Sequence, residues 1–254
     1  MKISNLDIEN DLFSGRRNDD VAVLRFKNKP LHHVTDLDAK KVLFDYLDLV
    51  SVSDRIKVLL IVGAPVKMGC KEYIEFYRGM IRERYDRFDR IWLERMYNAV
   101  NQLVLRLAGF NKMVIHADSG NVILLFLSMS LACDYRLVAD NTVFQNPNVD
   151  LGLAPKGGQT YFLSRMLGSA KTSRILLSGK DLSAAEAMKL GIVDEVVPLE
   201  DLDKAAIETA RHYAKQPAGY VAGVKKLLNY DLNHLECHLH YEDEELRKVI
   251  QLTV

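Results

Sequence analysis

The sequence has 254 residues, of which 48% are hydrophobic and 27% are charged, a globular composition that argues against disorder. A chain of this length is expected to form one α/β core with a small appendage. Its 34 basic and 34 acidic side chains cancel, so no overall charge attracts nucleic acid or an anionic membrane surface.

The three cysteines are widely spaced and form no CxxC pair, so they predict neither a disulfide framework nor a zinc finger. His234, Cys237 and His238 can share one helical face, but no second cluster completes a metal site, and no metal is expected. The N-terminus lacks an apolar stretch of signal-peptide length, and the longest apolar run, residues 122–127, is too short to span a bilayer. We therefore expect a soluble, cytoplasmic protein.

Residues 21–26 and 56–62 are short apolar runs rich in β-branched side chains, which predicts two buried strands. A helical pattern over residues 36–50 separates them. This β-α-β order is typical of parallel strands in an α/β fold.

Apolar residues recur at steps of three and four from Ile74 to Met96, which predicts one long amphipathic helix. A further strand is expected at residues 113–116. A turn at residues 118–120 and an apolar helix that ends at Ala132 follow it. After residue 198 the periodicity is helical, with Pro217 as the expected break.

Several short motifs lie between residues 114 and 198. They are Cys133-Asp134 at the end of a helix, the F-x-x-P of residues 144–147, Leu151-Gly152-Leu153, the pair Gly157-Gly158, and the block S-A-x-E-A-x-x-x-G-x-V-x-x-V-V-P that ends at Pro198. Together they resemble the signature region of the crotonase (enoyl-CoA hydratase/isomerase) superfamily. Residues 59–69 and 224–227 are similar to further parts of the family pattern, so the resemblance covers nearly the whole chain.

The resemblance implies an α/β fold of the crotonase type. Residues 1–198 would form its β-β-α spiral core, and residues 199–254 a C-terminal helical trimerisation region. The implied assembly is a homotrimer or a dimer of trimers. The implied partner is an acyl-CoA or a carrier-bound acyl thioester of fatty acid metabolism, with coenzyme A as part of the substrate and no tightly bound cofactor.

Crotonases polarise the thioester carbonyl with two backbone amides, the oxyanion hole, and these align here with Cys70 and Leu125. The family has consecutive glycines at the second donor, whereas this chain reads Leu124-Leu125-Phe126. Bulky side chains there narrow the site. If Leu125 alone faces the thioester and leaves room for it, an enzyme is favoured; if Phe126 fills the acyl cavity, a binding protein is favoured.

Both glutamates that water addition needs are replaced, because their positions align with Ser128 and Asn148. Neither side chain titrates near neutral pH, so hydration is not expected. Asp150 and Lys156 are the titratable candidates nearby. The alternative to a catalytic role is a solvated loop residue for Lys156 and a turn or cap residue for Asp150. A cation at Lys156 would stabilise a developing carboxylate or enolate.

For the coenzyme A itself, the resemblance implies contacts from Met68 and Gly69, ahead of the first donor, and from Lys225 and Lys226. Two lysines on a helix are equally typical of a solvated surface. Two hypotheses follow for the protein. It is an enzyme that acts through an enolate, such as an isomerase, decarboxylase or thioester hydrolase, or it is a non-catalytic acyl-CoA-binding or structural homologue.

Overall fold

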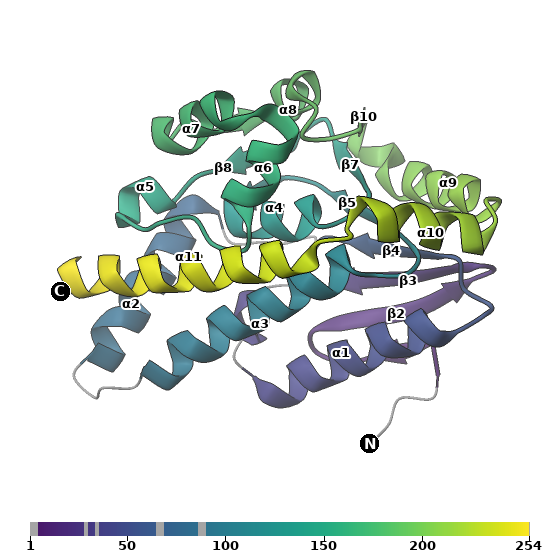
Figure 1. The fold of residues 1–254 in the computed structure, drawn as a ribbon, viewed down its shortest axis with the longest axis horizontal. Coiled ribbons are helices and arrows are strands. Elements are labelled where there is room, and N and C mark those ends of the chain that lie inside the picture. Colours follow the sequence, from purple (N-terminus) through teal and green to yellow (C-terminus); the bar gives the residue numbers. More distant parts are fainter. Residues whose placement is uncertain (1–4, 28–29, 34–35, 65–68, 86–89, 254) are drawn as a thin grey trace.

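The computed structural model describes residues 5–27, 30–33, 36–64, 69–85 and 90–253 (Figure 1). Within them, seven strands form the main sheet in the order β1-β2-β3-β4-β5-β7-β10, and three form a small sheet in the order β6-β8-β9. The main sheet contains β1 Ile8–Glu9, β2 Phe13–Asn18, β3 Val21–Phe26, β4 Val58–Val62, β5 Met113–Asp118, β7 Tyr135–Ala139 and β10 Glu195–Val197. The small sheet contains β6 Asn121–Ile123, β8 Val143–Gln145 and β9 Leu182–Ser183.

The central strand β4 shows why the main sheet forms. All five of its side chains are buried, and it pairs in parallel with β3 and β5. Leu59 and Ile61 enter the core on one face, while Val58, Leu60 and Val62 enter a second core on the other face. The predicted parallel arrangement and the strands over residues 21–26, 56–62 and 113–116 are confirmed.

Helices cover both faces of the main sheet. The helix α1, Leu37–Val52, begins at Asp36, whose carboxylate accepts hydrogen bonds from two first-turn amides, as an N-cap should. It shares one core with α3, Arg90–Ala108, and α4, Leu124–Leu131. On the opposite face, α9, Leu202–Ala214, packs its buried alanines against the strands. A short 3-10 helix, η1 Pro30–His33, precedes α1, and another, η2 Leu199–Asp201, precedes α9.

The prediction of one long helix over residues 74–96 is wrong. The structure has two helices there, α2 Cys70–Tyr85 and α3, which run in different directions (Figure 1). Both helices are amphipathic, so the spacing of apolar residues continues from one to the next and does not mark the boundary. Residues 86–89 lie outside the described part of the chain.

The small sheet places the start of α4. Strand β6 pairs in parallel with β8 and leads directly into α4, so the first turn of this helix is fixed by the β6–β8 pair. Four further helices follow β8: α5 Asn148–Leu151, α6 Gln159–Leu167, α7 Ser169–Ser178 and α8 Ala184–Leu190. The apolar helix predicted before Ala132 is confirmed.

Two helices follow α9, namely α10 Ala218–Leu228 and α11 Leu232–Thr253. The expected break at Pro217 is confirmed, since this residue is the N-cap of α10. The helix α11 runs alongside α3 (Figure 1) and packs against it, which brings the last segment of the chain next to the core. None of the helices described is both long enough and apolar enough to cross a membrane.

Candidate functional site

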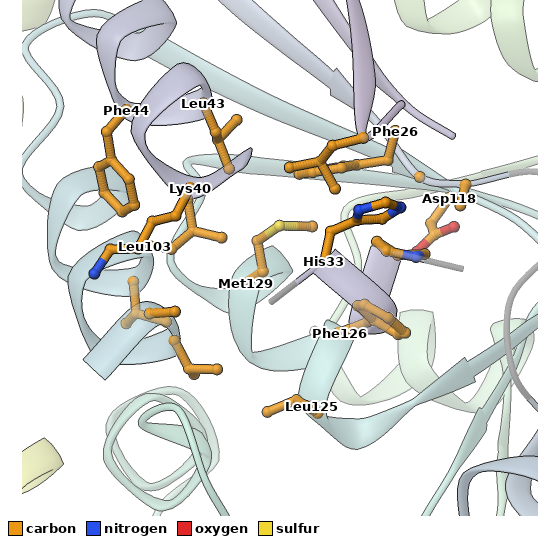
Figure 2. Close-up of a pocket in the computed structure, with 17 residues that line it drawn as sticks. Phe26, His33, Lys40, Leu43, Phe44, Leu103, Asp118, Leu125, Phe126 and Met129 are labelled. Carbon is orange, nitrogen blue, oxygen red and sulfur yellow. The ribbon is translucent and has the colours of Figure 1, made fainter. Parts of the chain in front are cut away.

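An apolar cavity of about 110 Å³ lies between α1, α3 and α4 and the ends of β3, β4 and β5 (Figure 2). Lys40 and Phe44 lie toward one end of it, and His33 and Asp118 toward the other. Its lining residues are Leu12, Phe26, Pro30, His33, Lys40, Leu43, Phe44, Gly63, Ala64, Ala99, Val100, Leu103, Val104, Asp118, Leu125, Phe126 and Met129.

A second, smaller cavity of about 20 Å³ lies on the other side of Val100 and Leu125, which line both cavities. It is lined by Tyr73 and Tyr77 of α2, Met96, Tyr97 and Val100 of α3, Leu125 of α4, Asn148, Leu153, Ala154, Lys156 and Gln159 of the segment after β8, and Leu246 of α11. Burial raises the pKa of the phenols, that of Tyr77 to about 12, so they remain neutral hydroxyl groups at neutral pH.

The amide of Leu125 belongs to the first turn of α4. The N-cap residue, Ile123, has an apolar side chain and makes no side-chain capping hydrogen bond to the amides of this turn. Leu124 points into the core, and Phe126 lines the larger cavity. Of the three residues that replace the expected glycines, only Leu125 lines the smaller cavity. Leu125 and Phe126 both line the larger cavity, so the structure contains part of each of the two expected arrangements.

The other expected donor, the amide of Cys70, begins α2 and already has a partner. It donates a hydrogen bond to Oε1 of Gln145 at 3.0 Å. The preceding amide, of Gly69, donates to the carboxylate of Glu72 at 3.3 Å, which is part of the capping of this helix. Met68, the remaining residue expected to contact coenzyme A in this loop, lies outside the described residues.

The two residues that replace the hydratase glutamates have structural hydrogen bonds. Ser128 is fully buried, and its hydroxyl lies 3.1 Å from the carbonyl oxygen of Leu124 and 2.8 Å from that of Lys156. Asn148 lines the smaller cavity and donates to the carbonyl of Ala154 at 3.4 Å. Neither side chain provides a group that titrates near neutral pH.

Lys156 is buried, so its interpretation as a solvated loop residue is wrong. Only 6% of Lys156 is exposed, and its ammonium group forms an ion pair with Asp243 of α11 at 2.6 Å. The same ammonium contacts Oδ1 of Asn101 and lies 5.5 Å from the ring centroid of Tyr97. Asn101 in turn donates to Asp243 at 2.9 Å. Burial lowers the pKa of Lys156, although Asp243 acts in the opposite direction.

Asp150 does not join this group. Its side chain is exposed on α5, and it is not among the residues that line the smaller cavity. Its backbone carbonyl accepts a hydrogen bond from Arg78 at 3.3 Å. The exposed position of Asp150 agrees with its interpretation as a turn or cap residue, and a catalytic role for it remains a prediction.

The expectation that Lys225 binds coenzyme A is not supported by its surroundings. Only 7% of Lys225 is exposed; its ammonium forms an ion pair with Asp134 and donates to the carbonyl of Lys112 at 2.8 Å. This lysine links α10 to the residues that precede β5 and β7. Because its charge is already paired with Asp134, it is not available to bind a phosphate. Lys226 is exposed, and its contact with coenzyme A remains a prediction.

Three residues of the site had no signal in the sequence. Asn101 lies in α3 beyond the residues whose spacing predicted a helix, and a single amide in a helix is typical of a surface position. Asp243 stands in an acidic run of α11 that resembles a solvated helix face. Gln145 lies within the F-x-x-P motif, where only the phenylalanine and proline carry the resemblance. The role of each residue depends on a partner that is distant in the sequence, so it can be recognised only in the folded structure.

A sequence model described as Enoyl-CoA hydratase/isomerase matches residues 81–251. The chain belongs to the enoyl-CoA hydratase/isomerase family. Solved structures of this family agree. Over 94% of both chains, the structure superposes on an enoyl-CoA hydratase from Bacillus halodurans with a TM-score of 0.79 and 19% identity. A putative enoyl-CoA hydratase/isomerase from Acinetobacter baumannii superposes with a TM-score of 0.72 and 22% identity, over 96% of this chain and 97% of the other. At these identities the likeness establishes the crotonase fold alone.

Among curated relatives, the "Fatty acid oxidation complex subunit alpha" of Shewanella loihica is 43% identical over 107 residues. That match covers 40% of this chain but only 15% of the relative. The corresponding subunit of Shewanella amazonensis is 41% identical over 106 residues, again 15% of its length. The matched region is thus about 15% of the length of each of these relatives.

Proposed function

We propose that the protein is an enzyme that acts on an acyl thioester, of coenzyme A or of a carrier, through the backbone amides of Cys70 and Leu125, and that it does not hydrate its substrate. One observation carries the proposal. The smaller cavity has at its wall Leu125, whose amide lies in the uncapped first turn of α4, and its one charged lining residue among those described is Lys156.

Two amides at helix N-termini suit the charge that develops in such a reaction. When a thioester forms an enolate, negative charge accumulates on the carbonyl oxygen. Preoriented N–H groups in a site without bulk water stabilise this charge without having to reorganise. The helix dipoles of α2 and α4 add a positive potential at the same ends.

Among isomerisation, decarboxylation and thioester hydrolysis, the loss of carbon dioxide from a β-carboxyacyl thioester requires the fewest acid or base side chains. The bond between Cα and the carboxylate breaks, and its electron pair moves into the enolate that the two amides stabilise. No general base is needed. A proton then returns to Cα, and the ammonium of Lys156, whose pKa is lowered by burial, is the donor that the cavity offers.

Hydration fits the site poorly because it needs a base to deprotonate water and an acid to protonate carbon. Ser128 is fully buried and bonded to carbonyl groups, and Asn148 does not titrate. The larger cavity adds room for an approaching thioester. Pro30 and His33 border it, and it reaches Leu125.

Calorimetric titration with coenzyme A, acetyl-CoA, crotonyl-CoA and malonyl-CoA, followed by mass spectrometry of each mixture, tests the proposal. We expect the thioesters to bind, crotonyl-CoA to remain unhydrated, and malonyl-CoA to be converted to acetyl-CoA. Binding of the thioesters without any turnover would instead support the non-catalytic alternative. Absence of binding by all four compounds would contradict the proposal.

The variant Leu125→Pro tests the second amide directly. Proline removes the N–H and is tolerated in the first turn of a helix, where that N–H has no intrahelical partner. We expect Leu125→Pro to abolish turnover while the protein stays folded, and Leu125→Ala, which keeps the amide, to retain it. A folded Leu125→Pro protein with the wild-type rate would refute the assignment of this amide.

A further inference from the structure

The side chain of Gln145 is hydrogen-bonded to the Cys70 amide, one of the two amides that the proposed reaction needs. Its Oε1 accepts the hydrogen bond of the Cys70 amide at 3.0 Å, in a partly buried position. The other end of the same carboxamide, Nε2, lies 3.4 Å from the carboxylate of Asp181. The carboxamide is thus held at both ends, with its oxygen directed at the first amide of α2.

The backbone of Gln145 lies beside the other donor. Gln145 is the last residue of β8 and stands opposite Ile123 in the parallel β6–β8 pair. Ile123 is the N-cap of α4, two residues before Leu125. Since paired strands lie about 4.8 Å apart, Gln145 is next to the start of α4 while its side chain reaches the start of α2. It therefore bridges the two helix N-termini.

We propose that Gln145 competes for the Cys70 amide and thereby determines how strongly the protein prefers a thioester to a ligand that lacks the carbonyl oxygen. Its carboxamide oxygen accepts the hydrogen bond that the thioester oxygen would accept, so the two oxygens compete for the same amide. The inference rests on the proposed function, because it assumes that Cys70 provides one of the two donors.

The competition discriminates between ground state and transition state. A carboxamide oxygen is a better hydrogen-bond acceptor than a thioester oxygen, so an unreacted thioester gains little by displacing Gln145. An enolate oxygen carries negative charge and accepts much more strongly than either, so it takes the amide readily. Because the enolate must also displace Gln145, the competition alone does not accelerate the reaction; it sets how strongly the charged oxygen must accept before it takes the amide.

The hydrogen bond itself is testable without any ligand. Residue-resolved amide exchange, measured by NMR on the unliganded protein, reports how well the Cys70 amide is protected. We expect Gln145→Ala to speed its exchange by about two- to tenfold, the factor that corresponds to one hydrogen bond. Gln102→Ala, an exposed glutamine on α3, is the matched control and should leave this exchange rate unchanged.

The competition is tested by comparing two coenzyme A derivatives, butyryl-CoA and its thioether analogue S-butyl-CoA, which lacks the carbonyl oxygen. Calorimetry gives the ratio of their affinities for each variant. We expect Gln145→Ala to raise the preference for the thioester by about two- to tenfold. In an Asp181→Asn background, which removes the neighbouring carboxylate, Gln145→Glu should lower it, since a carboxylate holds the amide more firmly.

The two measurements separate the possible failures. An unchanged Cys70 exchange rate in Gln145→Ala, or an affinity ratio that moves in the same direction in Gln145→Ala and Gln145→Glu, would overturn the role of Gln145 alone. If wild type and variants all fail to bind either compound while Cys70 exchange still responds to Gln145→Ala, the proposed function falls, and the competition falls with it.

Discussion

Replacing Asp243 by leucine should destabilise the protein strongly, because this change leaves the buried ammonium of Lys156 without its counter-ion. Both side chains of the pair are about 8% exposed. Removing one partner of a buried ion pair costs about 3–5 kcal/mol of unfolding free energy. For a protein of this size, each kcal/mol lowers the melting temperature by about 2–4 °C, so we expect a fall of about 6–20 °C.

The double variant Lys156→Met/Asp243→Leu should recover most of that loss. Burial lowers the pKa of Lys156 even though Asp243 is adjacent, which means that desolvation outweighs the attraction within the pair. Replacing such a pair by two apolar side chains of similar volume is often neutral or stabilising. In the double variant the side-chain amide of Asn101 loses its hydrogen bonds to both Lys156 and Asp243. This unsatisfied amide leaves a loss of about 1–3 kcal/mol in unfolding free energy relative to wild type.

The contribution of Lys156 to the unfolding free energy changes with pH in a defined direction. The folded-state pKa of Lys156 lies below its ordinary value of 10.5, so between the two values the unfolded chain binds more protons than the folded one. Stability contributed by this group therefore rises as the pH increases through that window. In Asp243→Leu the pKa of Lys156 is lowered further, because the attraction of Asp243 is lost. The difference in unfolding free energy between wild type and this variant should therefore shrink from pH 7 toward pH 10.

Urea unfolding followed by circular dichroism, at fixed protein concentration, measures all of these effects. The reasoning would be refuted if Asp243→Leu cost less than about 1 kcal/mol, or if the double variant lost as much as the two single variants added together. A deficit in Asp243→Leu that grew with pH would refute the assignment of the lost stability to a charged Lys156.

Three further predictions concern stability. Lys225→Met should cost about 3–5 kcal/mol because it leaves the carboxylate of Asp134 without its cation, whereas Lys226→Met should change stability by less than about 0.5 kcal/mol; equal losses in thermal melts would contradict the inward role of Lys225. Ser128→Glu should lower the melting temperature far more than Ser128→Ala and produce no crotonyl-CoA hydration, since the site is fully buried; hydration by a folded Ser128→Glu protein would show that the cavity accepts the family's glutamate. Ala99→Leu, which projects into the larger cavity, should stabilise the protein by about 1 kcal/mol, and a loss on denaturant unfolding would mean that the space is already occupied by its neighbours.

The sequence predicted the fold wherever local pattern and tertiary structure agree. The runs at residues 21–26 and 56–62 are apolar because both faces of those strands are covered, and so their pattern could be recognised directly. The boundary between α2 and α3 could not be recognised, because two amphipathic helices in succession keep the same spacing of apolar residues. The short strand β6 was also missed, since three residues carry too little periodicity.

The site was predictable only to the extent that the family resemblance named positions. It located Cys70 and Leu125, and it located Lys156, but it gave no sign that Lys156 is buried against α11. Burial of a charged side chain depends on a partner far away in the sequence, and the acidic run that contains Asp243 looks like any solvated helix face. For the same reason the adjacent lysines Lys225 and Lys226 look alike in the sequence, although only one of them points inward.

The polar group around Lys156 also has a consequence for how the chain folds. Asn101 and Asp243 are 142 positions apart, and Asn101 and Lys156 are 55 apart. Contacts between such distant segments form slowly, because a long stretch of chain must be ordered before they are gained. Because Asp243 lies on α11, the polar group is completed only when α11 docks, and until that step Lys156 lacks the counter-ion that it has in the folded protein.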